Sequence, residues 1–219
     1  MKSLLKAGFA LTALVAAFSA QAATITSSAS VGPIPTELNA NLNLNRFNTS
    51  LGTLTGATLV VNASANSTAT LTNTGAAAQT FRYGSSIDWI FAYGGALQSL
   101  TGTLLTQGLT SLAGGASLTV ASPGAATAAG TYALTGADLA FFTGTGLAAV
   151  NCSTLVGSTT TGGGGNIASS QNTTAGCNAT ITYTFTPTAP PAAVPVPASI
   201  ALLGLGLAGM GLSRRRKAV

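Results

Sequence analysis

The feature of this sequence that most limits its fold is an alternation of apolar residues with small or polar ones. Successive side chains of a β-strand point to opposite faces, so a period of two places the apolar residues on one face. Residues 23–194 also hold 33 threonines and 16 serines, and β-branched threonine suits a pleated surface better than a helix. The pattern therefore predicts half-buried strands. It is clearest in Leu38–Leu44, Thr68–Thr72, Ile87–Tyr93 and Ala179–Phe185, none of which has the period of a helix.

Turn residues separate the alternating runs at intervals of roughly ten residues, a spacing typical of the short strands of an antiparallel sandwich. We therefore expect one all-β domain over residues 23–186, a single antiparallel β-sandwich that is Ig-like or jelly-roll-like. An N-terminal signal helix and a C-terminal hydrophobic helix should flank it. The expected turns contain Gly52, Gly56, Gly75, Gly94-Gly95, Gly114-Gly115 and Pro123-Gly124.

Charged side chains are scarce: the chain has 8 basic and 3 acidic residues and no histidine. Six of the basic residues lie close to the two termini. The remaining two basic and three acidic residues give the body a net charge of about −1. The high isoelectric point of the whole sequence therefore comes from the basic residues near the termini. A basic surface for nucleic acid is not expected. The charged residues of the body are Glu37, Arg46, Arg82, Asp88 and Asp138.

The N-terminus has the pattern of a secretory signal peptide over residues 1–22. Two lysines within the first six residues form a positive region, and residues 7–18 form an apolar stretch too short for an ordinary membrane span. An A-x-A sequence follows, as signal peptidase requires, because its pocket accepts only small side chains there. We predict that the mature chain begins at Ala23. The predicted signal peptidase site consists of Ala20, Ala22 and Ala23.

Three segments follow the expected domain. Residues 187–197 are rich in proline and alanine and predict an extended linker, because proline fixes φ and lacks an amide donor. Residues 198–213 predict a hydrophobic transmembrane helix, although the 15 apolar or small positions of Ala198–Leu212 give only roughly 22 Å of helix for a hydrocarbon core of about 30 Å. Residues 214–219 predict a cytoplasmic tail by the positive-inside bias. The basic stop-transfer residues are Arg214, Arg215, Arg216 and Lys217.

The order of these segments resembles the PEP-CTERM sorting tail of Gram-negative bacteria. The motif of the resemblance is Val194, Pro195, Val196, Pro197 and Ala198, with Val196 where the family usually has an acidic residue. The resemblance implies that an exosortase, a membrane cysteine protease, cuts near these prolines. It also implies export through an inner-membrane intermediate to the cell surface, the outer membrane or the extracellular matrix. A plain tail-anchored helix is the alternative.

The body of the chain, over most of residues 23–185, also resembles a known domain family. Phe47–Leu54, Asn73-Thr74-Gly75 and Ala137–Gly146 resemble the choice-of-anchor E domain, a family that carries interchangeable C-terminal surface-sorting tails. The similarity extends over most of residues 23–185. It supports a fold and a destination but implies no biochemical activity.

Cys152 and Cys177 are the only cysteines. In an exported chain we expect them to form a disulfide, because the compartment is oxidising and the count is even. The enclosed segment contains Thr159-Thr160-Thr161 and the glycine run 162–165, which predict a flexible loop that the disulfide would staple. The glycine run lacks the lysine and the spacing of a phosphate-binding loop, and is interpreted as a linker.

The composition argues against catalysis. No histidine is present to serve as a base or a zinc ligand, and the three carboxylates of the body are far apart in sequence. Neither a calcium cluster nor an opposed pair of glycosidase carboxylates is expected. We predict no enzyme activity, no metal site and no cofactor.

One stretch could bind a ligand. Trp89, Phe91 and Tyr93 alternate and therefore share one face of a strand, as in sandwiches that stack aromatic rings on sugars. Burial of the same three rings in the core is the competing interpretation, because large side chains are few in this chain.

These observations predict an exported, non-catalytic surface or matrix protein with a structural or adhesive role in biofilm or exopolysaccharide. Its expected partners are signal peptidase, exosortase, the inner membrane transiently, and exopolysaccharide or further copies of itself. The alternative is a carbohydrate-binding module that uses the three aromatic residues.

Overall fold

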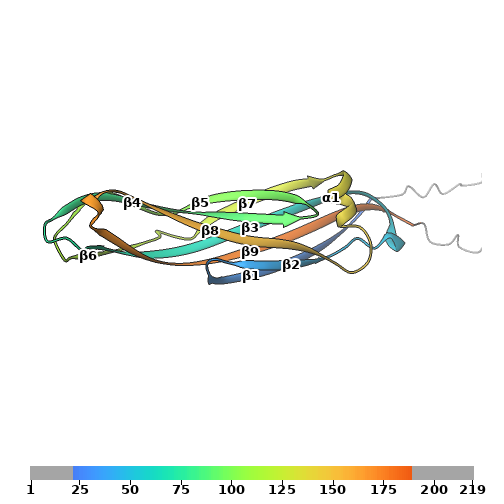
Figure 1. Ribbon diagram of the computed structural model, residues 1–219. Coiled ribbons are helices and arrows are strands. Elements are labelled where there is room, and N and C mark those ends of the chain that lie inside the picture. The colour runs from blue at the N-terminus through green and yellow to red at the C-terminus, as the bar shows by residue number, and fades with distance from the viewer. Residues whose placement is uncertain (1–21, 189–219) are drawn as a thin grey trace, which may run out of the picture. The chain divides into compact units, whose positions relative to one another are not determined.

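The computed structural model describes residues 22–188. The chain divides into two compact units, residues 1–187 and 188–219, and the description below concerns the first. This unit consists of two antiparallel sheets, which confirms the prediction of an all-β antiparallel sandwich (Figure 1). The two flanking helices that we expected lie outside the described residues. The strands are β1 (Ala23–Pro35), β2 (Asn39–Asn45), β3 (Gly52–Asn73), β4 (Gln79–Tyr93), β5 (Ala96–Leu112), β6 (Ser117–Ala121), β7 (Ala126–Leu134), β8 (Leu147–Gly162) and β9 (Ile167–Pro187).

Sheet A has the order β1-β9-β3-β6, with β7 also paired to β3, and sheet B has the order β2-β8-β4-β5. The longest ladder joins β3 to β9, from Gly52 opposite Pro187 to Asn73 opposite Ile167. With about 3.3 Å per residue, the 22 residues of β3 span roughly 70 Å. The first and last strands of the domain are also neighbours, since β1 pairs with β9 from Ala23 opposite Phe185.

The strands are longer than the ten-residue spacing predicted. Five of the six expected turn sites do lie in connections or at a strand boundary, but Gly56 lies inside β3. The ladder with β9 shifts register between Leu54 and Gly56, so the chain passes this glycine through a β-bulge. No proline or charged residue interrupts the alternation of β3 after that point, and the strand continues to Asn73.

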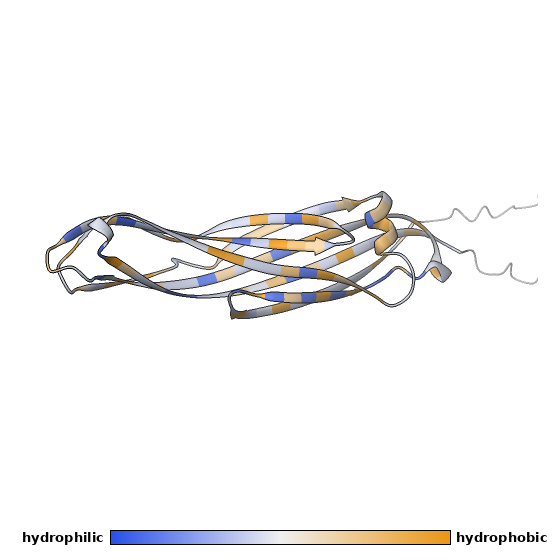
Figure 2. Cartoon of the chain, in the orientation of Figure 1, coloured by the Kyte–Doolittle hydropathy of each residue, from blue (hydrophilic) through white to orange (hydrophobic). Residues whose placement is uncertain are grey.

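The core lies between the two sheets and follows the predicted alternation. In β3 every second residue from Ala57 to Asn73 is buried, and β4 shows the same period from Phe81 to Tyr93. Figure 2 shows the alternating bands of hydropathy along the strands. The largest fully buried side chains are Trp89, Tyr183, Phe47, Phe81, Phe91 and Phe142.

A short helix, α1 (Gly136–Phe141), follows β7 and was not predicted. Phe141 and Phe142 at its end meet edge to face, with ring centroids 5.0 Å apart, and Phe142 also packs on Tyr93 at 5.6 Å. With six residues, the helix is too short to show a helical period in the sequence.

Trp89 gives a direct test of this core. Its side chain is fully buried, so Trp89→Ala should lower the free energy of unfolding by about 3–5 kcal/mol through lost apolar contact and the cavity left behind. Urea denaturation measures the change. Leu97→Ala is the matched control, because Leu97 is 71% exposed and its loss should change stability by no more than about 0.5 kcal/mol. Equal effects of the two substitutions would contradict the assignment of Trp89 to the core.

Candidate functional site

The predicted processing sites lie at and beyond the edges of the described residues. Ala23 is the first residue of β1, and the residue before it is exposed. Cleavage at the predicted bond would therefore leave the strand complete. Ala20 lies outside the described residues. So do the sorting motif at 194–198, the predicted transmembrane helix at 198–213 and the basic residues 214–217.

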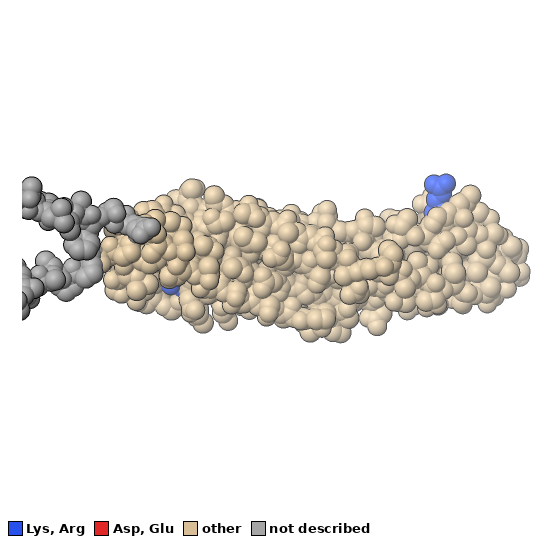
Figure 3. Space-filling view, turned by 180° about the vertical axis from the view of Figure 1, so that it is seen from behind, with Lys and Arg blue, Asp and Glu red and all other residues tan. Residues whose placement is uncertain are grey.

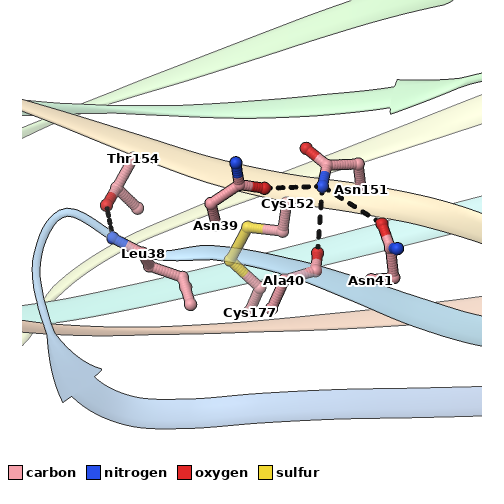
Figure 4. The surroundings of a disulfide bond; sticks show 8 residues. All are labelled: Leu38, Asn39, Ala40, Asn41, Asn151, Cys152, Thr154 and Cys177. Carbon is pink, nitrogen blue, oxygen red and sulfur yellow. Dashed lines mark hydrogen bonds between the residues drawn. A yellow bond between two sulfur atoms is a disulfide. The ribbon is translucent and has the colours of Figure 1, made fainter.

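The predicted disulfide is present (Figure 4). Cys152 on β8 and Cys177 on β9 are both buried, and their Cα atoms are 6.6 Å apart. Because β8 belongs to sheet B and β9 to sheet A, the bond joins the two layers through the core. Three asparagine side chains lie near the disulfide on the outer side of sheet B. The Asn151 Nδ2 group donates to Asn39 Oδ1 at 2.8 Å and to Asn41 Oδ1 at 3.1 Å.

The disulfide does not staple a flexible loop, and the interpretation of the glycine run as a linker was wrong. Thr159–Thr161 belong to β8 and pair with β4. Gly163–Gly165 form a single 3-10 turn, η2, that carries the chain from sheet B to sheet A. Gly162 to Gly165 all have positive φ, and a Cβ at Gly162 would lie 2.7 Å from the Thr80 carbonyl oxygen. Only glycine fits this tight crossing without strain.

The aromatic row is not exposed. Trp89 and Phe91 are 0% exposed and Tyr93 is 4% exposed, so no sugar ring can stack on them. All three point between the sheets, where a Cβ added at Gly102 of β5 would meet Trp89 Cζ3 at 2.8 Å. The core interpretation accounts for these residues, and the predicted glycan platform at Trp89, Phe91 and Tyr93 was wrong.

A buried polar cluster that the sequence did not reveal lies between the sheets. The Gln171 Nε2 group donates to Ser67 Oγ at 2.9 Å and to Ser85 Oγ at 2.8 Å, and the Tyr83 hydroxyl donates to Gln171 Oε1 at 2.6 Å. Ser67 and Thr173 are joined at 2.8 Å. With no histidine in the chain to deprotonate these hydroxyls, the cluster serves to satisfy buried polar groups and to fix the pairing of the sheets.

A second cluster, made of Arg46, Phe141 and Tyr183, lies near the end of β9 beside α1. The Arg46 guanidinium lies 5.3 Å from the centroid of the Phe141 ring, a cation–π arrangement. The Tyr183 hydroxyl donates to the Asn45 carbonyl oxygen at 2.7 Å. Burial raises the pKa of Tyr183 to about 12, and the nearby Arg46 charge opposes part of this rise.

The carboxylates are not gathered into a site. Glu37 lies between β1 and β2, where its Oε1 accepts from the Val156 amide at 3.2 Å, while Asp88 lies on β4 and Asp138 in α1. Within residues 22–188, no group of three or more acidic, histidine or cysteine residues could hold a metal ion. In the same range no helix is long and apolar enough to cross a membrane.

Comparison with known proteins finds one family, whose description is "PEP-CTERM protein-sorting motif", at residues 193–217. The C-terminal segment is a PEP-CTERM sorting motif. This match includes every residue of the predicted motif and all four basic stop-transfer residues, 214–217. It implies processing by an exosortase, export, and sorting to the cell surface or the extracellular space.

No curated protein matches the chain. Among solved structures, one of the infectious bursal disease virus Gx strain is similar at 10% identity and a TM-score of 0.25. The similarity covers 77% of this chain and 37% of the viral chain. At this TM-score the likeness carries no conclusion about fold or function, and the resemblance of the body to the choice-of-anchor E domain stays a prediction.

Replacing both cysteines tests the role of the disulfide. The bond closes a loop with a sequence separation of 25 residues, so Cys152→Ala with Cys177→Ala should lower the free energy of unfolding by about 3 kcal/mol. Denaturation of the native and double-variant proteins measures the loss. Thiol labelling is the control, with no reaction in the native protein and two thiols after denaturation and reduction. Unchanged stability in the double variant would show that the cross-link does not constrain the sheets.

The raised pKa of Tyr183 predicts that the folded protein loses stability at high pH. An ordinary tyrosine has a pKa near 10, so above that pH the unfolded chain releases this proton while the folded chain keeps it. Stability should therefore be complete below pH 10 and fall as the pH rises towards about 12, the pKa of folded Tyr183. Unfolding free energies measured across this range should fall more steeply in the wild type than in Tyr183→Phe. Parallel curves would contradict the assignment.

Proposed function

We propose that this chain is a non-catalytic structural or adhesive component of a bacterial extracellular matrix, delivered by exosortase processing of its C-terminal tail. The sorting motif at residues 193–217 carries the proposal, because it gives the chain a destination outside the cell. On this proposal the body is a choice-of-anchor E type domain, and the signal peptide at residues 1–22 begins the export.

The surface chemistry of the sandwich supports a matrix role. The face shown in Figure 3 has two small basic areas and no acidic one. All five charged residues of the body lie on β4, in α1 or in connections, and none lies on sheet A. Long-range charge steering, which accelerates encounters with charged substrates or nucleic acids, has little to act through on such a surface.

The arrangement of reactive groups supports the absence of catalysis. The hydroxyl cluster around Gln171 is enclosed between the sheets, and the carboxylates lie on separate elements. The disulfide cross-links the two layers, as suits a protein that must persist in an oxidising environment without chaperones. Reproducible turnover of a substrate by the purified protein would contradict this part of the proposal.

Intact mass tests the sorting. Protein recovered from the surface and medium of the host should begin at Ala23 and lack the hydrophobic C-terminal segment, whereas a strain without the exosortase should retain the full C-terminus. Pro195→Ala with Pro197→Ala, inside the matched motif, should also block the cut. Pro190→Ala with Pro191→Ala is the matched control, because these prolines lie outside it. A chain that ends at Val219 in every strain would instead make this a tail-anchored surface protein.

A further inference from the structure

Sheet A differs from sheet B in one respect that the fold alone does not require. None of its five strands contains a charged residue, whereas β4 of sheet B carries Arg82 and Asp88. The outward positions of β3 and β9 are mainly threonine, serine and asparagine. The outer face of sheet A is therefore a wide uncharged surface of hydroxyl and amide groups.

A hollow of about 520 Å³ interrupts this face near the middle of β9. Its floor includes Gly176 of β9, which has no side chain, and Ala129 of β7, which has a short one. The β1 chain bounds one side at Gly32 and Pro33, where a bulge between Val31 and Ile34 takes it out of register with β9. The hollow extends across β1, β9, β3 and β7, which at about 4.8 Å between strands is roughly 14 Å.

Four polar side chains of fixed register line the hollow, among small and apolar residues that form the larger part of its surface. Asn62 of β3 lies directly opposite Asn178 of β9, and Ala129 lies opposite Asn62 on the other side. In the next row, Ser64 lies between Gly176 and Thr127. Asn62, Ser64 and Thr127 are exposed, so their amide and hydroxyl groups are available to a ligand.

Hydrogen bonds to one residue of β1 and one residue of β9 hold the Asn178 side-chain amide in place. Its Nδ2 group donates to the Ala29 carbonyl oxygen at 3.3 Å, and its Oδ1 accepts from the Thr180 hydroxyl at 3.4 Å. An amide has two N–H donors and an oxygen with two lone pairs, so one of each remains. Together with Asn62 it presents paired donors and acceptors across two adjacent strands.

We propose that this hollow binds a neutral polysaccharide chain. An uncharged lining gives an acidic polymer nothing to pair with and would leave its charges to be desolvated without compensation. The four hydroxyl and amide side chains of the lining can form hydrogen bonds with a ligand that carries hydroxyl groups, directly or through bridging water. The proposal names the partner of the matrix role and rests on the proposed function.

A protein partner fits this face less well. The centres of protein interfaces are enriched in aromatic residues, methionine and arginine, and the outward positions of β3, β7 and β9 hold none of these. A peptide adds itself to a sheet at a strand edge, whereas the amide pair Asn62 and Asn178 lies on β3 and β9, which are paired on both sides at these residues. The occupant that remains is an extended, neutral, hydroxylated polymer.

The test measures retention of the exported protein, purified from its host, on immobilised dextran, mannan and amorphous cellulose. Dextran sulfate is the charged comparison with the same backbone as dextran. We expect the wild type to be retained on at least one neutral polymer, with little change between low and high salt, and not on dextran sulfate. Retention on dextran sulfate alone, or on no polymer, would overturn the proposal.

Two arginine substitutions on one strand locate the site. Ala129→Arg places a long charged side chain in the hollow and should weaken retention about tenfold or more, because it displaces the ligand and leaves polar groups unpaired. Ala133→Arg adds the same side chain on the same face of β7 outside the hollow, and should bind as the wild type does. Equal retention of the two variants, or an equal loss in both, would overturn the proposal.

Asn62→Ala, with Asn66→Ala as its control four residues along β3, gives a second test that adds no bulk or charge. Loss of retention in the first alone is expected, and no difference between them would overturn the role of the amide pair. Intact mass of the same preparations reports exosortase processing separately. Correctly processed protein that fails to bind would overturn the polysaccharide site while leaving the sorting part of the proposed function in place.

Discussion

The antiparallel ladder between β3 and β9 is the interaction on which the rest of this sandwich depends. It runs the whole length of both strands and places β9, the last strand of the domain, between β3 and the first strand, β1. Sheet A therefore cannot be completed until the chain has been made as far as Pro187. The disulfide acts on the same strand, since Cys177 ties β9 to β8 of the opposite sheet. A late, long-range closure of this kind is slow to form, and a covalent link across the layers then holds it.

A sandwich with so few charges needs another way to prevent its edges from pairing with other chains. Edge strands are usually protected by lysines, prolines, bulges or short length. Here β1 has a bulge at Gly32 and Pro33, β5 shifts register twice against β4, and β2, β6 and β7 have seven, five and nine residues. Backbone irregularity and short length therefore replace charge. Sheet A therefore needs no charged residues to protect its edges.

Sequence periodicity predicted the class of fold because alternation is a local property. Each segment chosen for its period of two lies within a strand, except that Leu38 directly precedes β2. The pairing of Cys152 with Cys177 followed from their number and the expected compartment. Strand length was wrong because a glycine such as Gly56 has the same signature in a bulge as in a turn. The role of the glycine run was wrong because sequence does not show that Thr159–Thr161 find a partner in β4.

The candidate sites depended on information that periodicity does not contain. Alternation places Trp89, Phe91 and Tyr93 on one face but does not say whether that face is inside or outside, and burial settled the question. The hollow on sheet A could not be predicted at all. Gly176, Ala129 and Pro33 lie on three strands, and only the pairing of β1 with β9 and of β3 with both β9 and β7 brings them together.

The hollow lies away from the end of the domain at which we expect both chain ends to be processed. Ala23 pairs with Phe185, so the chain enters and leaves the domain at the same end of sheet A. From that pair to Val31 opposite Cys177 is eight residues along β1, or roughly 27 Å of strand. Whatever holds the C-terminus during or after sorting is therefore attached at one end of the domain, while the neutral hollow lies well along the strands. A polymer could occupy the hollow without competing with the processing of either end.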